Sequence, residues 1–153
     1  MRLFFLLLPS DEVVLAKNGV AMMPILFGAD REPADELARY LEQMSGAAFV
    51  CTQAREGTNG IYVGTAADFP WLSLGPAAPD GILLKSDKKN LYLIARTPAG
   101  VRHAVATFLQ QEGCRWFFPG KTWEVVPKKD LIKGKWNEEQ APTFKDQRRI
   151  WYG

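Results

Sequence analysis

The chain has 153 residues, of which 47% are hydrophobic and 24% are charged, and its formal net charge is +2 at pH 7. This length suffices for one domain with an apolar core, but it is too short for that domain together with a catalytic barrel of about 250 residues. The composition excludes a disordered or collagen-like chain. The balanced charge offers no basic surface for nucleic acid, so we expect a soluble globular domain without a nucleic-acid partner.

Residues 1–12 begin with a positive charge and a short apolar run at 3–8, as an export signal does. The run stops at Pro9, acidic residues follow at Asp11 and Glu12, and no small-residue cleavage site closes it. We interpret residues 1–12 either as the remnant of a signal peptide or as an edge strand. An export signal favours an extracellular or periplasmic location without fixing it. No later segment has the ~20 apolar residues that a transmembrane helix needs.

A β-hairpin is predicted at the start of the domain. Residues 13–16 and 20–27 are apolar runs joined by Asn18 and Gly19, and this dipeptide supplies the positive φ angles of a tight hairpin turn. Pro24 has no N–H to donate to a neighbouring strand. The second strand is therefore expected at a sheet edge or at a bulge.

Two amphipathic helices are predicted, one over residues 30–45 and one over 98–112. In the first, apolar residues recur at helical spacing until Gly46 ends the run. In the second, Thr97 supplies a hydroxyl cap, the proline after it suits the first helical position, and Gly113 ends the apolar stripe. Each helix is expected to bury one face.

The remaining apolar runs predict short strands, and the stretch 65–79, rich in Pro, Gly and Ala, predicts a loop with at most one helical turn. Extended segments are expected at 49–52, 61–64, 81–85, 91–95, 114–118, 123–126 and 130–133. The predicted fold is α/β of the α+β type, with a mixed, largely antiparallel sheet and the two main helices packed on one of its faces.

Beyond Gly134 the chain becomes polar and loses its apolar pattern as far as Pro142, which is typical of a linker. Residues 148–153 then look like the opening of another strand. We therefore predict an α/β accessory domain over 13–134, followed at 135–153 by a linker and the start of a truncated downstream domain.

Few residues suggest catalysis. The single histidine, His103, is predicted to be exposed, because it falls off the apolar stripe of its helix. Glycosidic cleavage needs two carboxylates held close together, and the acidic residues here are expected on helix surfaces, in turns or in the linker. Cys51 and Cys114 match no metal-ligand spacing and are interpreted as free thiols, with a disulfide left open for a secreted protein. We expect no catalytic residue, no metal and no cofactor.

Aromatic residues and one arginine offer binding chemistry. The tryptophans could stack on sugar rings, although packing in a core or a domain interface is the commoner role. Arg115 could bind a carboxylate or phosphate, but we favour a place in a structural hydrogen-bond network. The five tryptophans are Trp71, Trp116, Trp123, Trp136 and Trp151.

Four segments occur in a recognisable order: residues 35–47 (DELARYLEQMSGA), 61–64 (IYVG), 91–93 (LYL) and 113–120 (GCRWFFPG). Together they resemble the N-terminal domain shared by family 67 α-glucuronidases, family 20 β-hexosaminidases and related bacterial glycosidase-like proteins of unknown function. The resemblance covers roughly residues 13–126. It implies a mixed sheet with helices on one side, followed in the chain by a catalytic (β/α)8 barrel.

The resemblance also bears on individual residues. The catalytic carboxylates of these families lie in the barrel, so no residue of this chain is expected to be catalytic. The segment that begins at Gly113 is expected to be a domain-packing motif. Its members are Gly113, Cys114, Arg115, Trp116, Phe117 and Pro119.

The tail offers one candidate substrate contact. In family 20 enzymes the first barrel strand opens with a Pro-x-Phe-x-x-Arg pattern whose arginine contacts the sugar. Pro142 and Phe144 match this pattern, but Gln147 stands in place of the arginine. Arg148 and Arg149, displaced by one and two positions, are therefore candidate substrate-binding residues.

Two functions follow from these observations, and a third, a small enzyme in its own right, ranks last because the sequence has no catalytic motif. The first is a non-catalytic accessory domain that packs against a downstream catalytic domain of the same chain, within a parent protein that is a glycoside hydrolase. The second is a stand-alone carbohydrate-binding module, for which the partner is a glycan. Fold alone does not choose between them.

Overall fold

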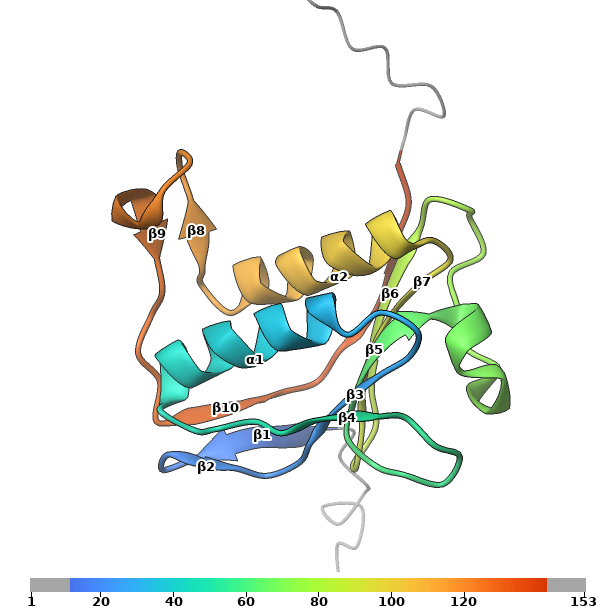
Figure 1. Ribbon diagram of the computed structural model, residues 1–153, viewed down its shortest axis with the longest axis horizontal. Coiled ribbons are helices and arrows are strands. Elements are labelled where there is room, and N and C mark those ends of the chain that lie inside the picture. The colour runs from blue at the N-terminus through green and yellow to red at the C-terminus, as the bar shows by residue number, and fades with distance from the viewer. Residues whose placement is uncertain (1–11, 143–153) are drawn as a thin grey trace, which may run out of the picture.

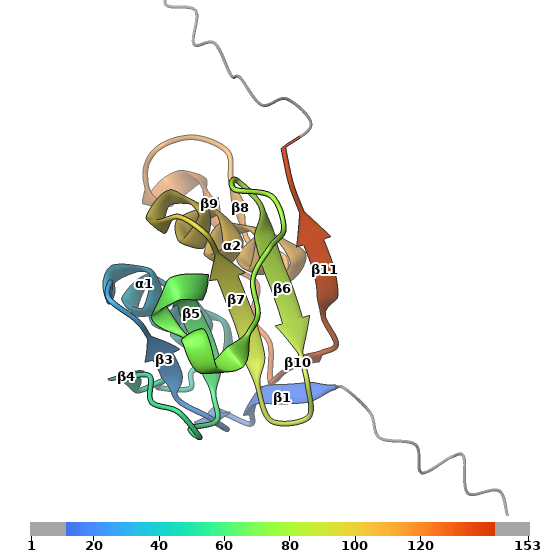
Figure 2. The same ribbon diagram turned by 90° about the vertical axis from the view of Figure 1, so that its right-hand side faces the viewer.

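The computed structural model describes residues 12–142, in which six strands form the main sheet (Figures 1 and 2). Four of these strands run parallel to one another, and the two at one edge run antiparallel to their neighbours. In order across the sheet they are β11 (Asn137–Gln140), β6 (Ile82–Ser86), β7 (Leu91–Ala95), β5 (Ile61–Thr65), β3 (Ile25–Phe27) and β4 (Cys51–Gln53).

Two smaller sheets complete the described residues. One contains β10 (Leu131–Gly134), β1 (Val13–Lys17) and β2 (Val20–Ala21), and the other pairs β8 (Arg115–Trp116) with β9 (Glu124–Val125). Across all three sheets, five of the eight strand pairings are antiparallel. The predicted mixed α+β fold is confirmed. The main sheet is less antiparallel than predicted, because three of its five pairings are parallel.

The helices α1 (Glu32–Ser45) and α2 (Pro98–Gln111) lie side by side on one face of the main sheet (Figure 1). The Thr97 hydroxyl accepts a hydrogen bond from the Gly100 N–H at 3.0 Å and caps α2, as its position before a proline predicts. Gly46 ends α1 in the left-handed conformation, and its N–H donates to the Glu42 carbonyl. Neither helix is long and apolar enough to cross a bilayer within the described residues.

Successive side chains along each strand point to opposite faces of the sheet, and those on one face form the core that the helices cover. On β5, Ile61 and Val63 belong to the core beneath the helices, whereas Tyr62 belongs to a second cluster on the opposite face. β7 repeats the pattern. Leu15 of β1 and Ile132 of β10 join the same main core, so the small three-stranded sheet packs into it as well.

The second face of the sheet is covered by the segment between β5 and β6. This segment contains two 3-10 turns, Ala66–Asp68 and Pro70–Leu72, where the sequence predicted a loop with at most one turn. Phe69 is buried there and meets Tyr62 edge to face, with ring centroids 5.1 Å apart. Aromatic residues thus hold the segment against the sheet (Figure 2).

The first predicted hairpin is confirmed, but its second strand is broken. Asn18 and Gly19 both have positive φ angles, as the turn requires. Beyond Ala21 the chain leaves β1 and enters the main sheet as β3, which has a parallel neighbour on each side. Pro24 therefore does not sit in an edge strand or a bulge. It precedes β3, where its carbonyl accepts a hydrogen bond from the Ile61 N–H at 2.9 Å.

The predicted linker is wrong for residues 137–140, which form the edge strand β11 paired with β6. Trp136 explains this difference, because it is only 7% exposed and its ring packs on Phe108 with centroids 5.3 Å apart. Its backbone N–H donates to the Ser86 hydroxyl at 2.9 Å, and its carbonyl accepts from the Ser86 N–H at 2.9 Å. This anchor brings the polar residues after it alongside β6.

We expect Trp136→Ala to destabilise the domain by about 3–5 kcal/mol, because it removes a buried aromatic ring and leaves a cavity beside α2. Trp123→Ala is the matched control, since Trp123 is 51% exposed, and it should change stability by less than about 1 kcal/mol. Urea unfolding followed by circular dichroism measures both. Equal losses for the two variants would show that residues 136–140 are not part of the folded unit.

Candidate docking surface and cavity

The motif at the end of α2 redirects the chain into the aromatic hairpin, the name used here for residues 115–125. Gly113 has a φ of +106°, which a residue with a side chain rarely adopts, and its N–H donates to the Gln110 carbonyl at 3.0 Å. The Arg115 guanidinium donates to the Gln110 and Cys114 carbonyls, each at 2.7 Å. Arg115 thus donates to a carbonyl in the last turn of α2 and to the Cys114 carbonyl just beyond it, as a structural hydrogen-bond role requires.

One hydrogen-bonded cluster fixes the base of the aromatic hairpin to α1. The Trp116 indole N–H donates to the Tyr40 hydroxyl at 2.8 Å, and that hydroxyl donates to a Glu124 carboxylate oxygen at 3.0 Å. The Tyr40 and Trp116 rings meet edge to face at 5.4 Å. Because Tyr40 is only 2% exposed, this cluster holds both hairpin strands against a fixed point on the helix.

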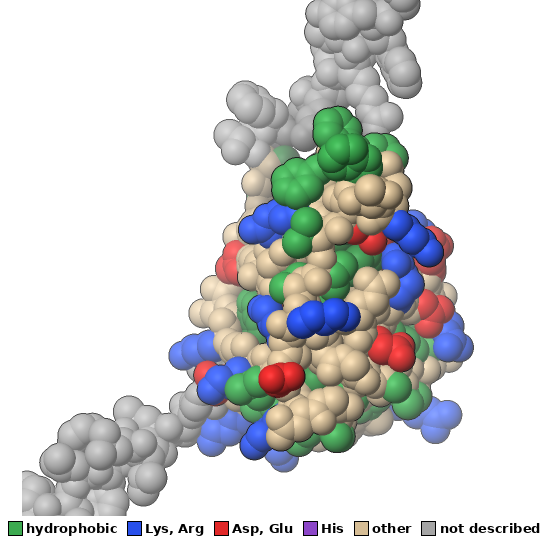
Figure 3. All heavy atoms as spheres, turned by 90° about the vertical axis from the view of Figure 1, so that its left-hand side faces the viewer, with side chains coloured by type: hydrophobic (Ala, Val, Ile, Leu, Met, Phe, Trp, Pro, Cys, Tyr) green, Lys and Arg blue, Asp and Glu red, His purple; other side chains and the backbone are tan. Residues whose placement is uncertain are grey.

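The tip of the aromatic hairpin is apolar and exposed. Phe117 is 63% exposed, Phe118 64% and Trp123 51%, and Val125 beside them is also exposed. Phe118 and Trp123 contact each other with ring centroids 5.2 Å apart and planes at 70°. Figure 3 shows these apolar side chains gathered at one end of the molecule.

The structure divides the predicted packing motif into two parts. Cys114 is buried and Trp116 is half-buried, so these residues pack within the domain. Phe117 and Phe118 do not, although the sequence led us to expect that they would pack. Pro119 and Gly120 form the turn between them and the second strand of the hairpin, as predicted.

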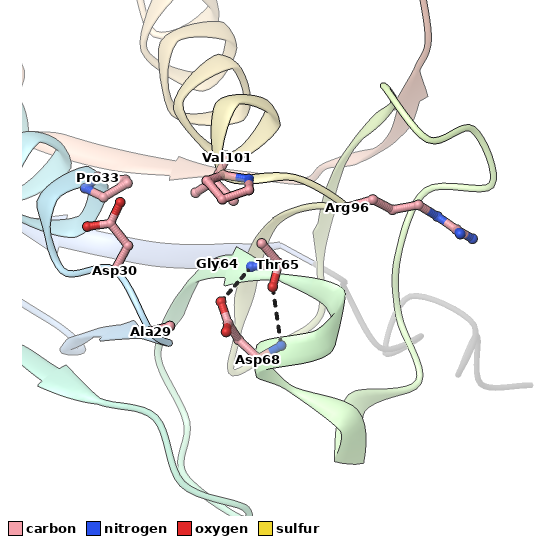
Figure 4. A pocket seen from close by; sticks show the side chains of 9 residues that line it. Ala29, Asp30, Pro33, Gly64, Thr65, Asp68, Arg96 and Val101 are labelled. Carbon is pink, nitrogen blue, oxygen red and sulfur yellow. Dashed lines mark hydrogen bonds between the residues drawn. The ribbon is translucent and has the colours of Figure 1, made fainter.

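A cavity of about 260 Å³ lies at the carboxyl ends of β3, β5 and β7 (Figure 4). The chain leaves β3 and β7 toward α1 and α2 on one face, and it leaves β5 toward the two 3-10 turns on the other face (Figure 1). Neighbouring parallel strands therefore send their connections in opposite directions, which opens a crevice between them.

Asp68 forms the floor of this cavity. Its Oδ2 accepts a hydrogen bond from the Thr65 N–H at 2.9 Å, and the Thr65 hydroxyl accepts from the Asp68 N–H at 3.3 Å. A side chain at Gly28 would lie 2.3 Å from the Asp68 Cγ, and one at Gly64 would lie 2.9 Å from its Oδ2. The two glycines thus make room for the carboxylate between the strand ends.

The mouth of the cavity carries opposite charges. One Asp30 oxygen, Oδ1, accepts a hydrogen bond from the Glu32 N–H at 3.0 Å, and the other, Oδ2, lies 3.9 Å from the Arg102 guanidinium. Arg96 also lines the cavity, but its Nε donates to the Pro76 carbonyl at 2.6 Å and its guanidinium points away (Figure 4). Apolar side chains, together with Gly64 and Thr65 at the end of β5, form the rest of the wall.

Other predicted site residues lie apart from these two features. Arg148 and Arg149 fall outside the described residues, so their substrate role stays a prediction. His103 is exposed on α2, as expected, beside a shallow hollow at the end of β11. Within residues 12–142, no group of three or more His, Cys, Asp or Glu side chains could hold a metal ion.

Both cysteines are free thiols. Burial, with the negative charge of Asp35 adding to it, raises the pKa of Cys51 to about 11. Burial also raises the pKa of Cys114, which packs with its sulfur 3.9 Å from that of Met44. A raised pKa keeps each group as the thiol at neutral pH, which is the unreactive form.

Sequence reasoning missed the cavity, because its polar members are scattered over three strand ends and match no motif. Its one local signal is Thr65 followed three residues later by Asp68, a hydroxyl and an acid at the spacing of a capping box. This signal predicts a turn and says nothing of a cavity.

The fold and these two features define a small α+β domain with a mixed sheet, two helices on one face and a projecting aromatic hairpin. No family model and no curated protein matches the chain. Among solved structures it is similar to "a novel family GH115 4-O-methyl-alpha-glucuronidase, BtGH115A, with specificity for decorated arabinogalactans", with a TM-score of 0.61, 18% identity and 86% of this chain covered. It is also similar to a mutant β-hexosaminidase of Streptomyces plicatus in complex with its product GlcNAc, with a TM-score of 0.50, 23% identity and 82% of this chain covered.

The match spans 18% of the length of the glucuronidase and 23% of that of the hexosaminidase. At these identities the likeness establishes the fold. The predicted resemblance to an α-glucuronidase and a β-hexosaminidase is therefore supported at the level of the fold, and the glucuronidase in question belongs to family GH115 rather than to family 67.

We expect Tyr40→Phe to lower the free energy of unfolding by about 1–3 kcal/mol, because it leaves the Trp116 indole N–H and the Glu124 carboxylate without their shared partner. Glu124→Gln is the control, since it keeps an acceptor oxygen for the Tyr40 hydroxyl and should lose less. Urea unfolding monitored by tryptophan fluorescence compares them. A Tyr40→Phe variant as stable as the parent would contradict the role of this cluster.

We expect both cysteines to resist alkylation in the folded protein. At pH 9, which is the ordinary pKa of a cysteine, the raised pKa leaves less thiolate in the native state than in the unfolded chain. Iodoacetamide labelling followed by mass spectrometry should therefore be slower by roughly tenfold or more without urea than with it. Native labelling of Cys51 at the rate of the unfolded chain would contradict the raised pKa.

Proposed function

We propose that this chain is the non-catalytic accessory domain of a glycoside hydrolase-like protein, in which it packs against and supports a downstream catalytic barrel. The exposed aromatic hairpin carries the proposal. A soluble domain rarely displays contiguous aromatic side chains unless another surface covers them, and large apolar patches mark interaction sites. Phe117, Phe118 and Trp123 form such a patch on a hairpin whose base is rigidly held.

The fold likeness supports a position within a larger protein. Both structural neighbours are glycosidases, and the matching part is less than a quarter of each chain. In both neighbours, most of the chain therefore lies outside the part that resembles this domain. The likeness does not by itself assign the accessory role.

A glycan is the second candidate partner for the hairpin, because Trp123 and Phe118 are exposed aromatic rings of the kind that stack on sugars. Their geometry favours protein docking. The two planes meet at 70°, so they form a wedge rather than the flat platform on which a sugar ring would lie. Edge-to-face aromatic pairs of this kind are common where protein surfaces pack.

The test uses the intact polypeptide that the gene encodes, compared with the 153-residue chain by hydrogen exchange. We expect amides 117–123 to exchange more slowly by roughly tenfold or more in the intact protein, because a docked domain excludes water from the hairpin tip. A hairpin variant, Phe118→Ser with Trp123→Ser, should abolish this protection. The control variant, Met22→Ser with Val50→Ser, removes two exposed apolar residues elsewhere and should retain it.

Two results would overturn the proposal. One is an encoded polypeptide with no further domain, and the other is identical exchange of the hairpin in the two proteins. Calorimetric titration of the chain with uronic-acid and N-acetylhexosamine polymers separates the second candidate. Saturable heat that the hairpin variant loses would support glycan binding in place of docking.

A further inference from the structure

The cavity at the carboxyl ends of β3, β5 and β7 has the topology of a ligand site. In open sheets with parallel strands, ligands bind in the crevice where adjacent strands send their connections to opposite faces. β5 is such a strand here, since its connection leaves on the face opposite to those of β3 and β7. No segment of the described chain fills the space of about 260 Å³ that results.

The polar groups of this cavity require a ligand that donates hydrogen bonds. Ionised carboxylates can only accept hydrogen bonds, and both Asp30 and Asp68 line the cavity (Figure 4). Among the described residues, the Oδ1 of Asp68 receives no hydrogen bond, while its Oδ2 is held by the Thr65 N–H. The Oδ2 of Asp30 has only the Arg102 guanidinium at 3.9 Å. One oxygen of each carboxylate is therefore available.

The charges exclude an anionic ligand. An anion would meet the carboxylates of Asp30 and Asp68, neither of which is neutralised by a close ion pair inside the cavity. The Arg102 guanidinium at the mouth is already paired with the Glu32 carboxylate at 2.9 Å, and the Arg96 guanidinium points away from the cavity (Figure 4). A neutral hydrogen-bond donor and a small cation remain, and the apolar wall favours the neutral ring.

The apolar part of the cavity wall and the volume of the cavity suit a ligand with a single ring. Apolar contacts come from Ala29, Pro33, Pro98 and Val101, which suit the C–H face of a small cyclic molecule. The volume of about 260 Å³ lies below the roughly 300–1,000 Å³ of pockets for drug-sized ligands. We propose that this cavity binds a neutral monosaccharide, whose hydroxyls donate to Asp30 and Asp68 and whose apolar face lies on the two prolines.

The proposal is tested on the 153-residue chain by NMR titration with glucose, galactose and N-acetylglucosamine up to about 50 mM, because so small a site implies millimolar affinity. The amide signals of Gly64, Thr65 and Val101 should shift saturably with at least one of these sugars. The amides of the aromatic hairpin, at the opposite ends of the helices, should not shift.

Three variants sharpen the test. Ala29→Phe places a ring in the mouth from an exposed position and should abolish binding while leaving the spectrum well dispersed. Asp30→Asn keeps the Oδ1 that accepts the Glu32 N–H, but it removes the charge and should weaken binding by roughly tenfold. Asp130→Asn, at another exposed acid, is the matched control and should bind as the parent does.

Charged comparison ligands test whether the cavity prefers a neutral molecule. Glucuronate supplies an anionic ring and ethanolamine a small cation, and both should bind more weakly than the best neutral sugar. Preferred binding of either would overturn the proposed class, and the absence of any saturable shift at Gly64 and Thr65 would overturn the site. Sugar shifts confined to Phe118 and Trp123 would also reject the cavity. These titrations use the 153-residue chain alone, so their outcomes do not depend on whether a second domain docks on the hairpin.

Discussion

Burial of one apolar face on each of α1 and α2 against the main sheet is the constraint on which the rest of the structure depends. Along β5 and β7, successive side chains point to opposite faces of the sheet. Only every second residue of each strand can therefore contact the helices. Once the helices are fixed, their ends are fixed too. The carboxyl ends of the parallel strands meet the start of both helices at the cavity, and Gly113 sends the chain from the end of α2 into the aromatic hairpin.

The aromatic hairpin is stabilised at its base, and its tip makes no contribution to the core of the domain. The two-residue strands β8 and β9 are too short to be stable alone. The Tyr40 hydroxyl compensates by joining Trp116 and Glu124, one from each strand, to a buried position on α1. The stabilising contacts all lie at the base of the hairpin, which leaves Phe117 and Phe118 free at its tip. These exposed apolar side chains are the surface on which the proposed docking depends.

The sequence predicted the elements whose signals are local. The Asn18-Gly19 turn, the Thr97 cap and the apolar stripes of both helices each identify an element within a few residues, and the structure contains all of them. It did not predict β11, because the polar side chains of residues 137–140 conceal a strand whose pairing depends on Trp136 reaching Phe108 and Ser86, 28 and 50 positions earlier in the chain. The cavity was missed for the same reason, since Asp30, Asp68 and Arg96 meet only after three strands have aligned.

The cavity and the aromatic hairpin lie at opposite ends of the helix pair (Figure 1). Each helix has 14 residues, which corresponds to a length of about 21 Å at 1.5 Å per residue. A domain docked on the hairpin tip would therefore leave the mouth of the cavity open to solvent. The two surfaces share no residue, and the rigid helices between them offer no two-state element through which one site would sense the other. The proposed ligand binding at the strand ends and the proposed docking at the hairpin would therefore be separable.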